Sequence, residues 1–307
     1  MPTVDPARVK KGLYWDRAIS LVEGCTPCGP ECRNCWSAVQ THMRAQQKCQ
    51  KHQARYGGLT DADGKFNGTV RFMEADLDKP LRTKKPTVWA VWNDLFHARV
   101  SVGEIYHAFD VMDQCRQHTF LVLTKRPGYI SETLYEPSGV KGPGYFSQKN
   151  FLPNVWLGTT CGHPESLWRV EELLKCPAAK RFVSAEPLLG ELDLTWIGKS
   201  SHYEYSRWNA LTGEAHAVAE GTEIPWDTIY PVGSGPICWL IIGPETGSKR
   251  RDCKEEWIES LIDQADNVGI PVFIKAFPIN GRVSKDMAEW PQWARRREFP
   301  TMTQESD

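Results

Sequence analysis

Short runs that are apolar at nearly every position recur along the chain and alternate with stretches of helical pattern. Runs such as VWAVW, FLVL and CWLII are typical of strands that are buried on both faces of a parallel sheet. They predict seven strands, at Ala18–Glu23, Thr87–Trp92, Thr119–Leu123, Val155–Thr160, Arg181–Ala185, Cys238–Ile242 and Pro271–Lys275. Helices are predicted between them, at Asn34–Tyr56, Val102–Gln117, Pro164–Leu174 and Lys254–Asn267. The alternation indicates an α/β protein, a parallel (β/α) barrel that is partial or near-complete, with about six to seven strands.

Two polar segments interrupt this alternation, and a third follows it. Residues 57–86 and 198–236 are predicted to be insertions within one domain that spans residues 1–293. The second insertion is rich in aromatic residues, namely Tyr203, Tyr205, Trp208, Trp226 and Tyr230. A loop of this length inside a compact domain is usually functional or disordered, and its aromatic content argues against disorder. Residues 294–307 are predicted to form a polar, solvated C-terminal tail.

Composition narrows the classes of protein to consider. The 307 residues carry a net charge of −1, so any contact with nucleic acid must come from local basic patches. No apolar run approaches the roughly 18 residues of a membrane span, and the first residues lack the apolar core of a signal peptide. We therefore expect a cytoplasmic protein with no membrane partner. Ten cysteines in a chain this long favour metal binding or redox chemistry over a disulfide scaffold.

Four of the cysteines lie within eleven positions, in the stretch GCTPCGPECRNCW after the first predicted strand: Cys25, Cys28, Cys32 and Cys35. One structural zinc usually needs two cysteine pairs that are farther apart. A ferredoxin-type cluster usually has a proline after its last cysteine, where this chain has Trp36. The third interpretation is a four-iron cluster that three thiolates hold, with one iron left open. The spacing Cys28-x3-Cys32-x2-Cys35 is that of radical S-adenosylmethionine enzymes.

Much of the chain resembles a narrower group of proteins. The similar motifs are EGC…ECRNCW, WNDLFH, HTFLVLTKRP, PNVWLGTT, RFVSAEPLLG, GPETG and PVFIKAF. In this order they resemble phage- and prophage-borne, radical-SAM-like proteins that are distantly similar to spore photoproduct lyases. That family has the cysteine pattern C-x6-C-x2-C, which matches Cys25, Cys32 and Cys35. The resemblance favours Cys25 as the first cluster ligand, whereas the general spacing favours Cys28. We expect Cys25, Cys32 and Cys35 to hold the cluster, with Cys28 as the alternative first ligand.

The resemblance implies a fold of the radical SAM type and a function. A 4Fe-4S cluster would cleave S-adenosylmethionine, and the resulting 5′-deoxyadenosyl radical would remove a hydrogen atom from the substrate. The implied substrate is DNA or a modified nucleotide in the bacterial host cytoplasm, and the implied reductant is a flavodoxin or a ferredoxin. We expect hypermodification of a phage DNA base, for example isomerisation of an amino-acid-modified thymidine. The alternatives are a lyase that repairs DNA photolesions and a non-enzymatic nucleic-acid-binding module that zinc or a cluster stabilises.

Polar residues at the predicted strand ends are the candidates for binding and catalysis, because chemistry in such barrels lies at the carboxyl ends of the strands. The resemblance implies contacts with S-adenosylmethionine for Asn93, Asp94, Thr159, Thr160, Ser184 and Glu186. Catalytic or substrate contacts are expected for Lys125, Arg126, Glu245, Lys275 and Cys161. Each has a simpler alternative. Asn93 and Asp94 fit an Asx turn, Cys161 fits core packing, and Lys275 fits an ion pair with Glu245 or Glu186.

Basic stretches supply the expected contact with nucleic acid. They lie at Lys79–Lys85, Lys125–Arg126, Lys249–Arg251 and Arg295–Arg297. They alternate with acidic residues, which is the usual pattern of a solvated surface. Together with the aromatic insertion at 198–236, they are expected to form a groove for a nucleic-acid backbone and a stacked or flipped base.

Overall fold

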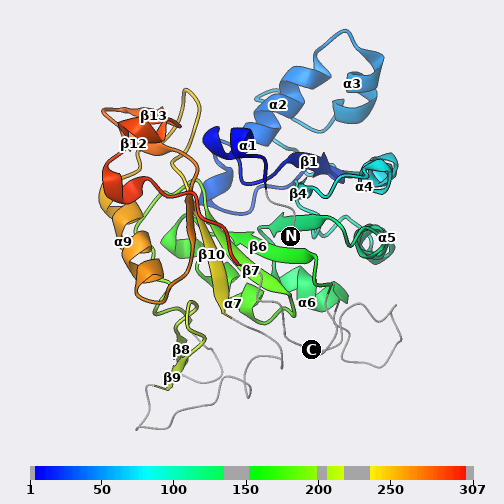
Figure 1. The fold of residues 1–307 in the computed structure, drawn as a ribbon. Helices are drawn as coiled ribbons and strands as arrows, with labels where there is room; N and C mark the ends of the chain where they lie inside the picture. The colour runs from blue at the N-terminus through cyan, green and yellow to red at the C-terminus, as the bar shows by residue number, and fades with distance from the viewer. Residues whose placement is uncertain (1–3, 135–151, 199–205, 218–235, 302–307) are drawn as a thin grey trace.

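The computed structural model describes residues 4–134, 152–198, 206–217 and 236–301. Its main feature is a seven-stranded parallel sheet that curls into a half-barrel, with the strand order β1-β4-β5-β6-β7-β10-β11 (Figure 1). These strands are β1 Arg17–Ser20, β4 Val88–Trp92, β5 Thr119–Thr124, β6 Val155–Thr160, β7 Lys180–Ala185, β10 Ile237–Ile242 and β11 Val272–Ile274. The seven predicted strands are confirmed. The first is shorter than predicted, because Val22–Glu23 leaves the sheet as β2 and pairs with β3, Arg71–Phe72.

Helices cover the convex face of the half-barrel (Figure 1). They are α4 Asp78–Arg82, α5 Val102–Gln114, α6 Gly128–Leu134, α7 Trp168–Leu174 and α9 Glu255–Asp266, and short 3-10 turns lie at η2 Glu74–Leu77 and η3 Pro164–Ser166. The predicted helix Asn34–Tyr56 is wrong in one respect, since it forms two helices, α2 Trp36–Ala45 and α3 Gln50–Tyr56. The turn between them lets α3 fold back, so that Arg55 reaches two buried carboxylates.

Aromatic side chains fill the concave face of the half-barrel. Their cluster includes Tyr14, Trp15, Trp156, Phe182, Trp239 and Phe273. Tyr14 and Trp15 come from the segment between α1, Pro6–Lys10, and β1. A side chain at Gly12 would place its Cβ 2.2 Å from the Lys275 carbonyl oxygen, and Gly12 has a φ of +72°, so only glycine fits this approach to β11. The N-terminal segment is thereby held against the end of the last strand.

The end of the described chain corrects the prediction of a solvated tail. The backbone N–H groups of Ile274 and Glu298 donate to Arg296 and Val272, respectively, at 2.9 and 3.0 Å. The Phe299 ring packs 5.4 Å from that of Trp239. The many charges of this segment predicted an exposed tail, but its pairing with β11 uses backbone groups, which do not depend on the side chains. Between it and β11 lie the hairpin strands β12 Phe277–Ile279 and β13 Arg282–Ser284, followed by η4 Met287–Glu289 and η5 Gln292–Ala294.

The two predicted insertions lie at different edges of the sheet. Part of residues 57–86 packs beside the loop that follows β1, through the pairing of β2 with β3. In the second insertion the structure describes the hairpin β8 Ser206–Trp208 and β9 Ala215–Ala217. The Ile237 N–H donates to the Ala210 carbonyl at 2.9 Å, which ties this hairpin to the start of β10. That is the amino-terminal edge, so this part does not join the strand-end cations in the expected groove; Tyr203, Tyr205, Trp226 and Tyr230 lie outside the described residues.

No helix among the described residues is both long and apolar enough to span a bilayer.

Arg55 fastens α3 to the rest of the molecule. Its guanidinium lies 2.5 Å from Glu23 Oε1 and 2.8 Å from Asp76 Oδ2, and both carboxylates are buried. Replacing Arg55 with Met is expected to lower the free energy of unfolding by about 1–3 kcal/mol, because it leaves the buried Glu23 carboxylate without its charged donor. Asp76 keeps Lys79 as a partner at 2.8 Å. Urea unfolding would measure the loss.

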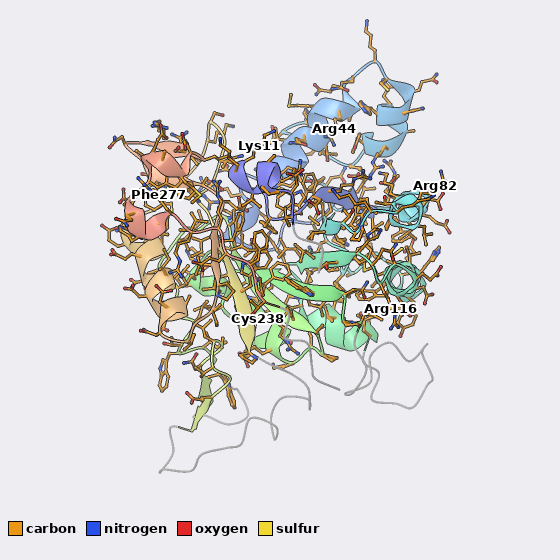
Figure 2. The ribbon with its side chains drawn as sticks, viewed as in Figure 1. Lys11, Arg44, Arg82, Arg116, Cys238 and Phe277 are labelled. Carbon is orange, nitrogen blue, oxygen red and sulfur yellow. The ribbon has the colours of Figure 1, made fainter. Side chains whose placement is uncertain are left out.

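Arg82→Met is the matched control for this change. Arg82 pairs with Asp78 on the exposed side of α4 (Figure 2), and such pairs contribute about 0–1 kcal/mol. Equal losses in the free energy of unfolding would show that the buried ion pairs of Arg55 contribute no more to stability than the exposed pair of Arg82.

Candidate functional site

The four clustered cysteines lie in one loop at the carboxyl edge of the half-barrel, after β1 and β2. The loop contains the turn η1, Pro30–Cys32, and it ends at Cys35, which is the N-cap of α2. Gly24 opens it with a φ of +87°, and a Cβ there would lie 2.0 Å from the Thr69 carbonyl oxygen. The Gly68 N–H donates to the Cys25 carbonyl at 3.2 Å. The first insertion therefore supports the start of this loop.

A buried ion pair fixes the middle of the cysteine loop. Arg169 on α7 donates from Nη1 to Glu31 Oε2 at 3.1 Å and from Nη2 to the Cys28 carbonyl at 2.9 Å. Both side chains of the pair are almost fully buried. Glu31 also accepts from the Gly162 N–H at 3.2 Å, and Arg169 donates to the Thr160 carbonyl at 3.0 Å. The loop is thus attached to the carboxyl end of β6.

The environment of Glu31 keeps its carboxylate charged. Burial opposes the charge, but the nearby Ser166 hydroxyl and the Arg169 guanidinium outweigh burial and hold the pKa of Glu31 below its usual value. Apart from Arg169 Nε, which is buried without a hydrogen-bond partner among the described residues, the charged groups of the pair bond to each other and to neighbouring backbone groups. This indicates that the role of the pair is to position the loop.

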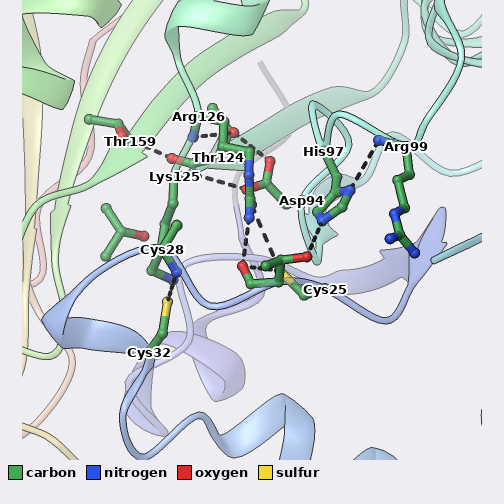
Figure 3. A network of polar contacts seen from close by, with 12 residues as sticks. Cys25, Cys28, Cys32, Asp94, His97, Arg99, Thr124, Lys125, Arg126 and Thr159 are labelled. Carbon is green, nitrogen blue, oxygen red and sulfur yellow. Dashed lines mark hydrogen bonds and ion pairs between the residues drawn. The ribbon is translucent and has the colours of Figure 1, made fainter. Parts of the chain in front are cut away.

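Cys28 and Cys32 lie side by side next to Lys125 (Figure 3). The Cys28 N–H points to Cys32 Sγ at 3.5 Å. The hydrogen bond from the Cys28 thiol lowers the pKa of Cys32 to about 5, and the same bond raises the pKa of Cys28. Burial works against the charge of Lys125, but Cys32, Cys35 and Cys28 are near enough to raise its pKa. Lys125 is therefore the cation that these three thiols share.

Cys25 has a different environment. Its sulfur lies 3.8 Å from Arg126 Nη1, and the same nitrogen lies 2.5 Å from Asp94 Oδ2. Burial, followed by the negative charge of Asp94, raises the pKa of Cys25 to about 11. Arg126 also donates to the Thr26 carbonyl at 2.6 Å, and the Thr26 hydroxyl lies 3.0 Å from His97 Nε2. Cys25 thus belongs to a hydrogen-bonded cluster with Arg126 and Asp94 (Figure 3).

The residues at the end of β4 already have partners within the protein. Asp94 accepts from the Thr124 hydroxyl at 2.5 Å in addition to its pairing with Arg126. Asn93 has a φ of 59° and donates to the Ser20 hydroxyl and the Val22 carbonyl at 2.8 and 2.6 Å. Its amide oxygen accepts from the Ser37 hydroxyl of α2 at 2.8 Å. Both side chains connect elements around the cysteine loop.

A second polar group lies where β7 and β11 end. The Lys275 ammonium pairs with Glu186, and it lies 5.6 Å from the ring centre of Tyr14 and 5.4 Å from that of Trp15. Burial, together with the charge of Glu186, raises the pKa of Tyr14, while the nearby Ser184 hydroxyl opposes the shift. Of the two partners considered for Lys275, the structure selects Glu186.

Glu245 has other partners than Lys275. Its carboxylate accepts from Arg251 Nη2 at 2.5 Å and from Asn34 Nδ2 at 2.9 Å. Burial opposes its charge, but hydrogen bonds from Arg251 and Asn34 hold the pKa of Glu245 below its usual value. Since Asn34 lies between Cys32 and Cys35, Glu245 is a second anchor of the cysteine loop.

Two candidates of the predicted set do not join this site. The Thr159 hydroxyl donates to the Thr124 carbonyl at 2.9 Å, and the Thr159 side chain is fully buried. Cys161 belongs to the apolar core on the helix-covered face, where burial raises its pKa to about 12. Thr160 lies opposite Ser184 in the register of β6 and β7, and successive residues of a strand point to opposite faces. Thr160 is thus on the same face as Ser184, and Thr159 is on the other.

Sequence reasoning missed several residues that shape the site. They are Tyr14, Trp15, Glu31, Asn34 and Arg169. Arg251 was expected only as part of a basic stretch, not as the partner of Glu245. A signal existed for Arg169, because it is a charge within the apolar pattern LWRVEELL. Glu31 and Asn34 lie inside the cysteine motif, in which only the thiols were predicted to have a role. Their partners are more than a hundred positions away, so no local pattern could name them.

The family of the chain follows from its sequence over this same region. A family model described as "Protein of unknown function (DUF5131)" matches residues 12–299. The chain belongs to the DUF5131 family. The match includes the cysteine loop and every strand of the half-barrel. No curated protein and no solved structure matches the chain.

The described donors of the DUF5131 chain fit a metal group in type, although they do not yet converge on one point. In the described residues, no three His, Cys, Asp or Glu side chains already converge as a metal site. The donor type does fit, because four thiols in one loop are what iron–sulfur clusters use, and Cys28 and Cys32 are already adjacent. A pocket of about 610 Å³ lies between residues 250–257 and the β12–β13 hairpin, and none of the four cysteines lines it.

Proposed function

We propose that this DUF5131 protein is a radical S-adenosylmethionine enzyme whose 4Fe-4S cluster is held by three of its four clustered cysteines. One observation carries the proposal: a loop with four thiols at the carboxyl edge of a parallel half-barrel, next to the cations Lys125, Arg126 and Arg169. Cations near thiols favour the thiolate form that binds metal. The carboxyl edge is also where α/β barrels carry their chemistry.

We propose Cys28, Cys32 and Cys35 as the ligands. Support comes from the adjacency of Cys28 and Cys32, since the Cys28 N–H lies 3.5 Å from Cys32 Sγ, and from Lys125, which lies near Cys28, Cys32 and Cys35. Cys25 instead lies 3.8 Å from Arg126 Nη1. Arg169 holds the Cys28 backbone in place. The family resemblance favours Cys25 as the first ligand, and the geometry favours Cys28. Serine replacement of each cysteine decides between them.

The residues around the loop have separable tasks in this proposal. When bound, the cluster and S-adenosylmethionine would supply the radical chemistry that removes a hydrogen atom from an unactivated carbon. Lys125 offsets the negative charge of the thiolates. Tyr14 and Trp15 keep water from the concave face, and Glu186 and Lys275 offer a carboxylate and an ammonium for a zwitterionic amino-acid group. Asn93 links the end of β4 to α2 through the Ser37 hydroxyl, and Asp94 links it to β5 through the Thr124 hydroxyl.

The proposed substrate is a nucleobase-linked group in DNA, and the proposed reaction is hypermodification of a base, such as isomerisation of an amino-acid adduct. Lys249 and Arg250, after β10, are exposed at the carboxyl edge and suit a phosphate backbone. Lys125, Arg126 and Arg251 are instead engaged by the thiols, Asp94 and Glu245. By contrast, Lys79–Lys85 precedes β4 and lies at the opposite edge. Repair of a DNA lesion would use the same radical and differs in the product.

Anaerobic reconstitution with iron and sulfide tests the proposal. We expect brown protein with absorption near about 400 nm from thiolate-to-iron charge transfer. With dithionite and S-adenosylmethionine, it should release 5′-deoxyadenosine, which chromatography detects. Colourless protein that holds one zinc would instead identify a zinc-stabilised binding module. A brown protein that forms no 5′-deoxyadenosine, with or without DNA, would contradict the radical assignment.

A further inference from the structure

Helices α2 and α3 form an arm, residues 36–56, that projects from the half-barrel (Figure 1). The arm starts directly after Cys35, so its first turn belongs to the candidate site. Its far end is fixed by Arg55, which pairs with Glu23 and Asp76. The arm is thus a supported element beside the cysteine loop, and the outer face of α2 is exposed.

One face of α2 carries an exposed apolar stripe. Trp36, Val39 and Met43 are 47%, 53% and 61% exposed. Their spacing of three and four residues places them on one side of the helix, and Ala38 and Thr41 are buried on another side. Single exposed apolar residues are common, but a contiguous stripe that adjoins a candidate site is typical of a binding surface.

The arm is also basic. The arm contains four Lys or Arg residues and no Asp or Glu, and Arg33 lies just before it, whereas the whole chain has a net charge of −1. Arg44 and Arg55 are used within the arm and its anchor. Arg33, Lys48 and Lys51 are exposed, and none of the three forms an ion pair with another described residue. Such a surface is suited to a partner that has flat apolar groups to lie on the stripe and negative charges to pair with the cations at its two ends.

Trp36 is held in a fixed orientation. Its ring meets that of Trp92 edge-on at 5.0 Å, and Trp92 meets Trp15 edge-on at 5.9 Å. Lys275, whose ammonium lies 5.4 Å from the Trp15 ring, ends this series at the candidate site. A supported aromatic ring loses little conformational freedom when a ligand stacks on it. The series of rings therefore connects the stripe on α2 with the polar group of the concave face.

We infer that the arm binds a single strand of nucleic acid and leads it to the cysteine loop. The stripe from Trp36 to Met43 is about 10 Å long, the length of about three bases stacked at about 3.4 Å each. Bases lie on Trp36, Val39 and Met43, and phosphates lie on Arg33, Lys48 and Lys51. Aromatic platforms flanked by cations bind single strands in this way. The inference rests on the proposed function, because it assigns the substrate of that site to a polynucleotide.

The test is fluorescence anisotropy with labelled 15-nucleotide oligo(dT), with oligo(U) and with duplex DNA as separate arms. It uses the full chain, without reductant or S-adenosylmethionine. The double variant Lys48→Glu with Lys51→Glu is expected to bind at least about tenfold more weakly, and the slope of log K against log salt should fall by about 1.4 for two lost single-strand phosphate contacts. Trp36→Ala should weaken binding about 5- to 150-fold at an unchanged salt slope.

Lys84→Glu with Lys85→Glu is the matched control, since these exposed lysines precede β4 at the opposite edge. Equal weakening by both pairs, or wild-type protein that binds no single strand, would overturn the inference. It would also be overturned if the arm variants bound oligonucleotides normally and only slowed reduction of the reconstituted protein by an acidic flavodoxin. Arm-dependent binding by a protein that never yields 5′-deoxyadenosine would refute the radical function and leave the arm assignment standing.

Discussion

Replacing Arg169 with Gln is expected to lower the free energy of unfolding by about 3–5 kcal/mol. The substitution leaves the Glu31 carboxylate buried without its partner, and breaking a buried ion pair on one side carries a cost of this size. It also removes the donor to the Cys28 carbonyl. Urea or thermal unfolding at neutral pH measures the loss. A change below about 1 kcal/mol would contradict the structural role of the pair.

The pH dependence of this effect has a definite sign. In the native protein the pKa of Glu31 lies below its ordinary value of 4.5. The pair therefore stabilises the fold fully above about pH 4.5, and this contribution is lost as the pH falls through the lower native pKa. Arg169→Gln removes the positive charge that offsets the effect of burial on Glu31, so the pKa of Glu31 should rise. The stability gap between the two proteins should consequently narrow in acid.

Two controls separate loss of the pair from loss of an arginine. Glu31→Gln combined with Arg169→Gln leaves no buried charge and should recover part of the stability lost by Arg169→Gln alone. Arg282→Gln removes an exposed partner of Glu289 and should change stability little. If the double variant were as unstable as the sum of the two single variants, the energetic coupling of Glu31 and Arg169 would be disproved.

Serine replacement of single cysteines is expected to abolish the cluster at three positions of the loop. Cys28→Ser, Cys32→Ser and Cys35→Ser should each lose most of the iron and the absorption near about 400 nm after reconstitution, because three thiolates are the minimum for the proposed cluster. Cys25→Ser should keep both, because Cys25 is engaged by Arg126. Iron content per chain and the visible spectrum measure the result.

Cys49→Ser is the control, since Cys49 lies at the start of α3 and outside the loop. If Cys25→Ser lost the cluster and Cys28→Ser kept it, the family pattern would hold and our ligand assignment would fail. If none of the four loop replacements changed the iron content, the loop would not be the binding site at all.

The seven strands and their common edge were predictable because each strand is a local apolar run. The sequence VWAVW shows by itself that β4 is buried on both faces, and strand order followed chain order. Since the cysteine loop follows the first strand, its place at the carboxyl edge was predictable too. Which of two adjacent side chains faces the site was harder. Thr159 and Thr160 are successive residues of β6, so their side chains point to opposite faces of the sheet. The register of β6 and β7 shows that Thr160 is the one that shares a face with Ser184.

The charged residues show most clearly what the sequence by itself determined and what only the tertiary structure decided. Sequence determined that cations and carboxylates gather at the strand ends. It did not determine their pairing, because partners lie 89 positions apart for Glu186 and Lys275, 138 for Glu31 and Arg169, and 211 for Asn34 and Glu245. Hydrophobic periodicity is a local property of the chain. Which residues form ion pairs depends on distances in space, and only the folded half-barrel sets these distances. The resulting hydrogen bonds and ion pairs attach the cysteine loop to β6 and to the residues after β10.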